Sequence, residues 1–87
     1  MAIEVTPRAV EVLRRALEVG GMDPARVGIR VSVARGGELR TGFAEEAEPG
    51  ERTVVAGGGV RLFVPDELAA GEATIDVADE HDRMVLR

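Results

Sequence analysis

Apolar residues follow a helical period near the N-terminus of the 87-residue sequence. Between residues 7 and 19 they lie mostly three or four positions apart and make one stripe, which consists of Ala9, Val10, Leu13, Ala16 and Leu17. Thr6-Pro7 favours initiation, because threonine caps a first turn and proline needs no amide partner there. The pattern predicts a helix over residues 7–19, ended by Gly20-Gly21 and preceded by a short strand at residues 3–5.

From residue 27 onward the apolar period changes to two, which indicates strands. The alternation is clearest over residues 27–35, where the apolar positions are Val27, Ile29, Val31 and Val33. Gly36-Gly37 allows a tight turn and predicts a hairpin with a second strand over residues 38–43. One face of this second strand carries Leu39, Thr41 and Phe43.

The remaining sequence predicts more short elements separated by glycine and proline. In order, we expect a polar loop at residues 45–50, a hairpin of residues 53–55 and 60–64 around Gly57-Gly58-Gly59, a helical turn at 65–70, a strand at 73–77, a turn at 79–82 and a strand at 83–87. A strand, a helix and then about six short strands predict a mainly β, α+β fold. We expect one domain over residues 1–87: a β-sandwich of short strands with the N-terminal helix packed on one side.

Composition narrows the possible functions. Hydrophobic residues make up 45% of the sequence, but only two residues, Phe43 and Phe63, are aromatic. We therefore expect a core of valine, leucine, isoleucine and alanine. A net charge of -5 without a basic run disfavours nucleic acid as a partner. No apolar stretch approaches the roughly 20 residues that span a bilayer, and the N-terminus lacks a signal-peptide pattern. We therefore expect a cytoplasmic protein without a membrane partner.

The sequence contains no cysteine and one histidine, His81. The absence of cysteine excludes disulfides, zinc-thiolate sites and thiol catalysis within these residues. Hydroxyl residues are few, and none stands beside a plausible base in the sequence. We therefore do not expect an enzyme.

Three other patterns allow a functional and a structural interpretation. Gly36-Gly37 and Gly57-Gly58-Gly59 could cradle a phosphate, but neither ends in Gly-Lys-Ser/Thr, so turns are favoured. The run 79–82 with Asp76 could hold a divalent ion, although adjacent turn residues rarely converge on one ion. Paired carboxylates could act as in glycosidases, but solvated surface acids are favoured; these pairs are Glu45 with Glu46 and Asp66 with Glu67.

Three stretches resemble, in order and spacing, the A-type iron-sulfur carrier family, or HesB-like domain. Residues 3–9 are similar to the family's opening, an apolar residue and threonine that lead into the first helix. Residues 27–37 resemble its strand and glycine pair. Residues 59–76 resemble its Gly-Val strand, helical turn and Ile-Asp strand. The resemblance implies the carrier fold and a habit of self-association.

The same resemblance shows what this sequence lacks. The family has a cluster-binding cysteine directly after the glycine pair, where Glu38 stands, and a Cys-x-Cys pair in a tail that would lie beyond Arg87. Glutamate is a hard oxygen ligand, poorly matched to an iron-sulfur cluster. We therefore expect a degenerate, cysteine-free member that holds no cofactor and acts through self-association or contact with another protein.

The hairpin around the replaced cysteine is the candidate binding site, with Arg35, Glu38 and Arg40 as its residues. Charged hairpin tips are also ordinary protein surface, and that interpretation is favoured by about three to one. An alternative function is a small-ligand or metal-ion binder that reuses the emptied cluster site around Glu38.

Overall fold

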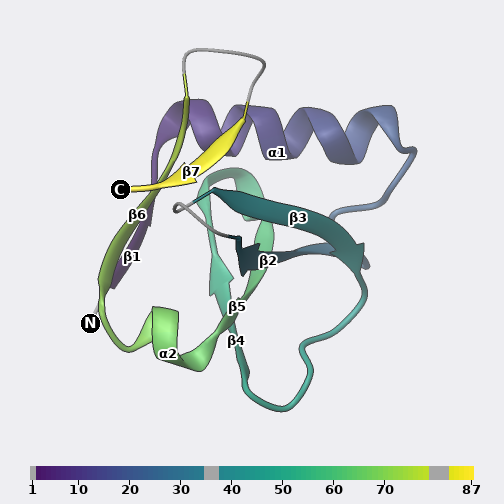
Figure 1. Ribbon diagram of the computed structural model, residues 1–87. Coiled ribbons are helices and arrows are strands. Elements are labelled where there is room, and N and C mark those ends of the chain that lie inside the picture. The colour runs from purple at the N-terminus through teal and green to yellow at the C-terminus, as the bar shows by residue number, and fades with distance from the viewer. Residues whose placement is uncertain (1, 35–37, 79–82) are drawn as a thin grey trace.

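The structure is a computed structural model, and it describes residues 2–34, 38–78 and 83–87. One sheet has the strand order β1-β6-β7 and consists of β1 (Ala2–Val5), β6 (Glu72–Val77) and β7 (Met84–Leu86). The other has the order β3-β2-β5-β4 and consists of β2 (Gly28–Val33), β3 (Leu39–Ala44), β4 (Glu51–Val55) and β5 (Arg61–Pro65). The long helix α1 (Pro7–Val19) and the short helix α2 (Asp66–Ala69) lie on opposite sides of the sheets (Figure 1). The predicted mainly β, α+β fold is confirmed.

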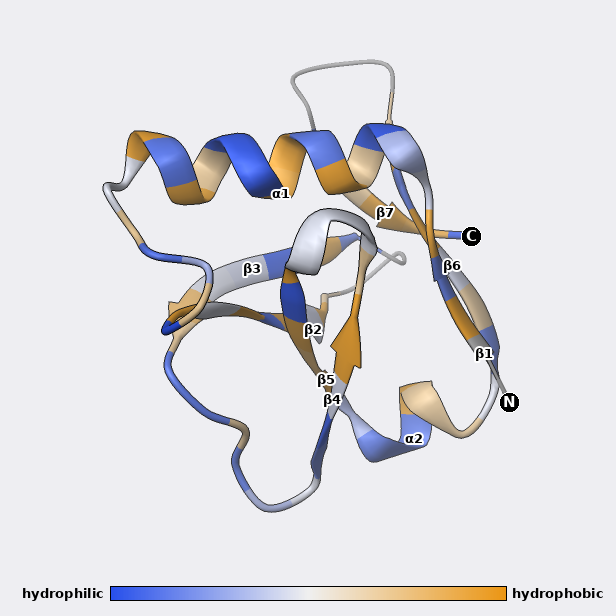
Figure 2. Cartoon of the chain, turned by 180° about the vertical axis from the view of Figure 1, so that it is seen from behind, coloured by the Kyte–Doolittle hydropathy of each residue, from blue (hydrophilic) through white to orange (hydrophobic). Residues whose placement is uncertain are grey.

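The helix α1 has the predicted bounds and start. The Ala9 amide donates to the Thr6 hydroxyl oxygen at 3.2 Å, and Pro7 is the first helical residue. Hydrophobic and hydrophilic residues alternate along the helix (Figure 2), as one-sided burial requires. The fully buried stripe is Ala9, Leu13 and Leu17, whereas Ala16 is exposed. The predicted stripe was therefore correct in its two leucines and wrong at Ala16.

The three-stranded sheet joins distant parts of the sequence. β1 runs parallel to β6, with Ile3 opposite Ala73 and Val5 opposite Ile75. β6 then pairs antiparallel with β7. The sequence predicted a strand near each of these three positions, but the parallel partner of β1 lies about 70 residues away and comes from the tertiary fold.

The four-stranded sheet contains both predicted hairpins. β2 pairs antiparallel with β3, β4 pairs antiparallel with β5, and a parallel pairing of β2 with β5 joins the two hairpins. A single 3-10 turn, η2 (Gly57–Gly59), connects β4 with β5, and Gly58 and Gly59 have φ of 73° and 78°. These positive φ values confirm that the triple glycine serves a turn. The other glycine pair, Gly36-Gly37, and the turn predicted at 79–82 lie outside the described residues.

The core lies between the sheets and the two helices. Its most deeply buried members are Ala9, Leu13, Leu17, Ile29, Val31, Val60, Leu62, Val64, Ile75 and Val77. This cluster contains no aromatic residue, but it includes Met84, which the expected set of valine, leucine, isoleucine and alanine left out. Phe63 is also buried, at 1% exposure, but it lies outside this cluster.

Phe63 packs on the opposite face of β5 from its buried neighbours Leu62 and Val64, as strand alternation requires. Its ring lies against Gly28 of β2, where an added Cβ would come within 2.8 Å of Phe63 Cε2. The guanidinium carbon of Arg61 lies 5.8 Å from the ring centroid. A glycine and an arginine side chain thus help to bury the ring on the outer face of this sheet.

The sheets meet at the start of β3. Glu38, which precedes β3, forms an isolated antiparallel bridge with Val85 of β7. No helix in the described part of the chain is long and apolar enough to cross a membrane.

Candidate functional site

The β2-β3 hairpin brings together two of the three predicted site residues. Glu38 and Arg40 are two positions apart, so they share a side of the strand. The third predicted residue, Arg35, lies outside the described residues. An open hollow beside the hairpin is lined by Ser32, Val33, Ala34, Glu38 and Arg40. The predicted pair therefore lines a shallow surface rather than an enclosed pocket.

The two charged residues of this hairpin, Glu38 and Arg40, differ in their ionic contacts. Glu38 Oε2 lies 3.5 Å from Arg83 Nη1, and both side chains are about half exposed. The Glu38 carbonyl also accepts a hydrogen bond of 2.7 Å from the Ala34 amide. Arg40 is exposed and forms no ion pair with any described residue. Glu38 thus has a cationic neighbour, while the Arg40 guanidinium faces solvent.

The donor chemistry of this site does not suit an iron-sulfur cluster. It offers one carboxylate, one guanidinium and the Ser32 hydroxyl, whereas such clusters are held mainly by thiolates. Among the described residues, no group of three histidine, aspartate or glutamate side chains could hold a metal ion. The predicted ion site over 79–82 lies outside the described residues, apart from Asp76.

Asp76 instead joins three elements. Its Oδ1 accepts hydrogen bonds of 2.8 Å from the Thr6 hydroxyl and the Val77 amide, and its Oδ2 accepts one of 2.8 Å from Arg87 Nε. The Thr6 hydroxyl, with help from the Val77 amide and Arg87, holds the pKa of the Asp76 carboxyl below its ordinary value. The carboxylate connects the cap of α1 with β6 and the residue after β7.

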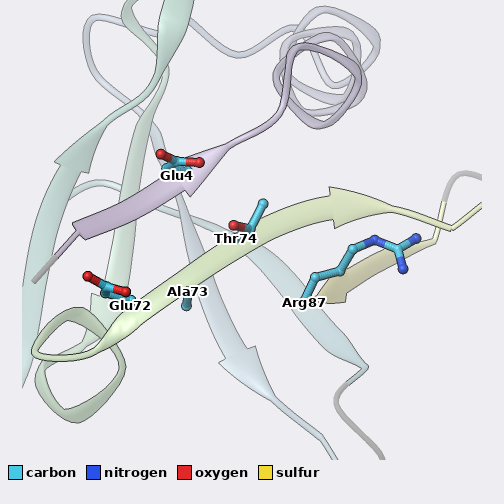
Figure 3. Close-up of a pocket in the computed structure, with 5 residues that line it drawn as sticks. All are labelled: Glu4, Glu72, Ala73, Thr74 and Arg87. Carbon is cyan, nitrogen blue, oxygen red and sulfur yellow. The ribbon is translucent and has the colours of Figure 1, made fainter.

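A second hollow lies on the outer face of the three-stranded sheet (Figure 3). Its lining residues are Glu4, Glu72, Ala73, Thr74 and Arg87. Figure 3 shows Arg87 extending away from both glutamates, which agrees with its bond to Asp76. Glu4 and Glu72 are exposed and form no ion pair with described residues. The hollow presents two solvated carboxylates, an ordinary arrangement for an acidic surface.

The loop between β3 and β4 is fixed to the outer face of the sheet by Arg30. Arg30 Nε lies 2.8 Å from Glu51 Oε2, and Arg30 Nη2 donates to the Glu46 carbonyl at 3.2 Å. The hydrogen bond from Arg30 lowers the pKa of Glu51, and the Glu48 amide, which also donates to Glu51, adds to the effect. The backbone of this acidic loop is therefore anchored, although the loop is solvent-exposed.

Sequence reasoning missed the exposed side of β3. Leu39 is buried, whereas Thr41 and Phe43 on the same face are exposed, Phe43 at 47%. The Phe43 ring lies beside the end of α1, where an added Cβ on Gly20 would come within 3.4 Å of Phe43 Cε2. Alternation predicts which residues share a face but not how far a helix covers that face, so no local signal could have shown this exposure.

The paired acids are all exposed, as expected of surface carboxylates. These are Glu45, Glu46, Asp66 and Glu67. Asp66 Oδ1 lies 3.8 Å from Arg52 Nε. Glu45 and Glu46 line an open hollow that Asp66 and Glu67 do not line. The two pairs therefore do not face each other across this hollow, as glycoside hydrolysis would need.

Comparison with solved structures shows what the fold is similar to. The structure matches that of SufA from Escherichia coli, which is involved in biosynthesis of iron-sulfur clusters, with a TM-score of 0.68 and 20% identity over 100% of this chain and 83% of SufA. It matches IscA with a [2Fe-2S] cluster with a TM-score of 0.57 and 22% identity, over 99% and 82% of the two chains. A protein from Aquifex aeolicus, solved by NMR, gives a TM-score of 0.70 and 22% identity over 100% and 95%.

The sequence matches no protein-family model and no curated protein. At 20–22% identity, the structural matches establish the fold. They confirm the fold that the sequence resemblance implied, and they cover nearly all of this chain. The 87 residues have the HesB-like fold of the A-type iron-sulfur carriers and contain no cysteine.

Proposed function

We propose that this chain is a non-enzymatic, single-domain relative of the iron-sulfur cluster carriers that binds no cluster with its own residues and acts through contacts with protein chains. The observation that carries the proposal is a carrier fold kept over the whole chain together with a cysteine count of zero. A fold needs its core, whereas cluster ligation needs thiolates. The described residues keep the first and lack the second.

The hairpin site supports the same reading. The sequence resemblance places Glu38 where the carrier family has its first cluster cysteine, and in this structure Glu38 pairs with Arg83. A carboxylate already beside a guanidinium, without two further metal donors nearby in the described residues, gives little support to an ion site around Glu38. Arg40 and the exposed Val33 remain open to a protein surface.

Affinity capture tests the proposal. The tagged chain is recovered from a lysate of its own host, co-purifying proteins are identified by mass spectrometry, and the visible absorbance of the same eluate is recorded. We expect proteins of iron-sulfur cluster assembly, with any colour contributed by a partner chain. The Arg40→Ala variant should recover less of a partner that contacts the hairpin.

The matched control is Arg26→Ala, because Arg26 is also an exposed arginine, precedes the opposite end of β2 and forms no ion pair with a described residue. The control should behave as the unaltered chain does. Recovery of this chain alone, without colour, would contradict a role in iron-sulfur assembly.

A further inference from the structure

The outer face of the four-stranded sheet carries a square of four residue positions on β2 and β3. Strand alternation places Arg30 and Ser32 on this face, because Val31 between them is buried on the other face. Ser32 lies opposite Arg40, and Arg30 lies opposite Gly42. Two arginines thus occupy diagonal corners of the square, and a serine and a glycine occupy the other two corners.

An open hollow lies over this square. Its lining residues are Arg30, Ser32, Arg40, Thr41, Gly42 and Phe43. Gly42 leaves space in the hollow, because it has no side chain and a Cβ built there would meet nothing within 4 Å. The volume of about 250 Å³ is below the roughly 300–1,000 Å³ of pockets that hold drug-sized ligands. The hollow therefore suits a small ligand.

Arg40 gives the hollow an uncompensated positive charge. Its side chain is exposed and forms no ion pair or hydrogen bond with a described residue. Glu38, two positions away on the same side of the strand, has Arg83 Nη1 3.5 Å from its Oε2. In a chain with a net charge of -5, this unpaired guanidinium attracts an anion from solution.

Arg30 is held in a fixed position at the opposite corner. Its Nε lies 2.8 Å from Glu51 Oε2, and its Nη2 donates to the Glu46 carbonyl at 3.2 Å. Its third nitrogen, Nη1, forms no hydrogen bond with a described residue. Glu51 offsets the charge of Arg30, so Arg30 contributes a positioned donor more than a net charge.

These donors favour a phosphate group as the ligand. Diagonal neighbours on adjacent strands are about 7–8 Å apart, which long side chains can span. The Arg40 guanidinium, the Ser32 hydroxyl and Arg30 Nη1 come from three corners of the square, and none of the described lining residues is acidic. A tetrahedral phosphate can accept hydrogen bonds from several directions, whereas a planar carboxylate is satisfied by a single guanidinium.

We propose that this hollow binds the phosphate group of a phosphate monoester, with Arg40 as its charged contact and Ser32 and Arg30 as further donors. Small phosphorylated metabolites and phosphorylated protein side chains both carry this group. The hollow is open to solvent, and Glu46 and Glu48 lie close to Arg30. We therefore expect weak binding, with a Kd of about 1 mM.

Titration followed by two-dimensional ¹H–¹⁵N NMR tests the proposal. The probe is glycerol 3-phosphate, which is mainly a dianion at about pH 7.5. Sodium chloride keeps the ionic strength constant, and acetate provides the comparison with a carboxylate. We expect saturable shifts of the Ser32, Arg40 and Gly42 amide signals. Acetate should bind at least about threefold more weakly, because it leaves one donor unused.

Variants identify the binding residues. Arg40→Gln should weaken phosphate binding at least about tenfold, and Ser32→Ala about threefold. Gly42→Val fills the hollow without a clash at Cβ, and it should weaken binding at least about tenfold. Arg26→Gln, which removes an exposed arginine before β2, should bind as the unaltered chain does. Circular dichroism of each variant confirms that it is folded.

A short phosphoserine peptide distinguishes the two sources of the group. Tighter binding of the peptide than of glycerol 3-phosphate would assign the site to a phosphorylated protein, and equal or weaker binding would assign it to a small ester. The inference would be overturned by the absence of saturable shifts up to about 20 mM probe, by acetate binding equal to that of phosphate, or by unchanged binding in both Arg40→Gln and Gly42→Val. Absence of phosphate binding would leave the proposed protein contacts standing, because affinity capture measures them separately.

Discussion

Asp76 accepts hydrogen bonds from three parts of the chain: the cap of α1, its own strand, and the residue that follows β7. The Thr6 hydroxyl that donates to Asp76 also accepts from the Ala9 amide. One carboxylate thereby fixes the start of α1 against the three-stranded sheet. A neutral side chain at this position would lose the charge-assisted part of these bonds.

The lowered pKa of Asp76 predicts a pH-dependent contribution to stability. Because the folded state favours the ionised carboxyl, its contribution is present above the unfolded value of about 3.9 and is lost as the pH falls through the lower folded value. We expect Asp76→Asn to lower the free energy of unfolding at pH 7, and we expect the difference from the unaltered chain to shrink as the pH falls below about 3.9. Urea unfolding at several pH values measures this difference.

The matched control for this variant is Glu72→Gln, because Glu72 is an exposed acid on the same strand and forms no ion pair with a described residue. It removes the same charge, so the effect of net charge is common to both variants. A loss of stability at pH 7 that is equal in both, or that persists unchanged at low pH in Asp76→Asn, would exclude the hydrogen-bonded carboxylate as the cause.

Among the elements, α1 and the two hairpins could be predicted because their signals are local. A cap at Thr6, proline at the first turn and a three-to-four residue period define α1. Glycine turns between alternating segments define the hairpins. The parallel pairing of β1 with β6 depends on contacts across about 70 residues, so no local pattern could predict it.

The candidate site could be predicted in part. The resemblance led to the β2-β3 hairpin, and the structure places Glu38 and Arg40 at one open hollow. The pairing of Glu38 with Arg83 could not be predicted, because it depends on how β7 meets β3. The exposure of Phe43 depends in the same way on the position of α1 over the sheet.

The packing of β2 against β5 gives a prediction at this scale. Gly28→Ala should destabilise the protein by about 1–3 kcal/mol, because the new methyl group would overlap the Phe63 ring at 2.8 Å and the Arg61 carbonyl oxygen at 2.9 Å. Urea unfolding measures the change. Phe63→Leu in the same background should recover part of it, since the two changes share one contact.

Gly42→Ala is the matched control for Gly28→Ala. Gly42 lies in the neighbouring strand, pairs with β2, and has nothing within 4 Å of an added Cβ. It should change the free energy of unfolding by roughly 0.5 kcal/mol or less. An equal loss in both variants would mean that strand glycine itself, and not the Phe63 ring, determines the cost.

At the scale of the whole molecule, fold and ligation have separate physical requirements. The fold requires a buried aliphatic core, two sheets and the helix that covers them, and all of these are present. Ligation of an iron-sulfur cluster usually requires thiolates, and the 87 residues contain none. The chain therefore has the fold of a carrier without the thiolates that a cluster needs.

Anaerobic cluster reconstitution tests most directly whether this chain has the carrier fold without the ability to bind a cluster. The purified chain, with any metal-binding tag removed, is incubated with ferrous iron, sulfide and a thiol reductant, then desalted and examined for visible absorbance and bound iron. IscA, whose structure contains a [2Fe-2S] cluster, is treated identically as the positive control. We predict that IscA becomes coloured and that this chain stays colourless and retains no iron. A stable visible chromophore with bound iron and sulfide on this chain alone would contradict the account.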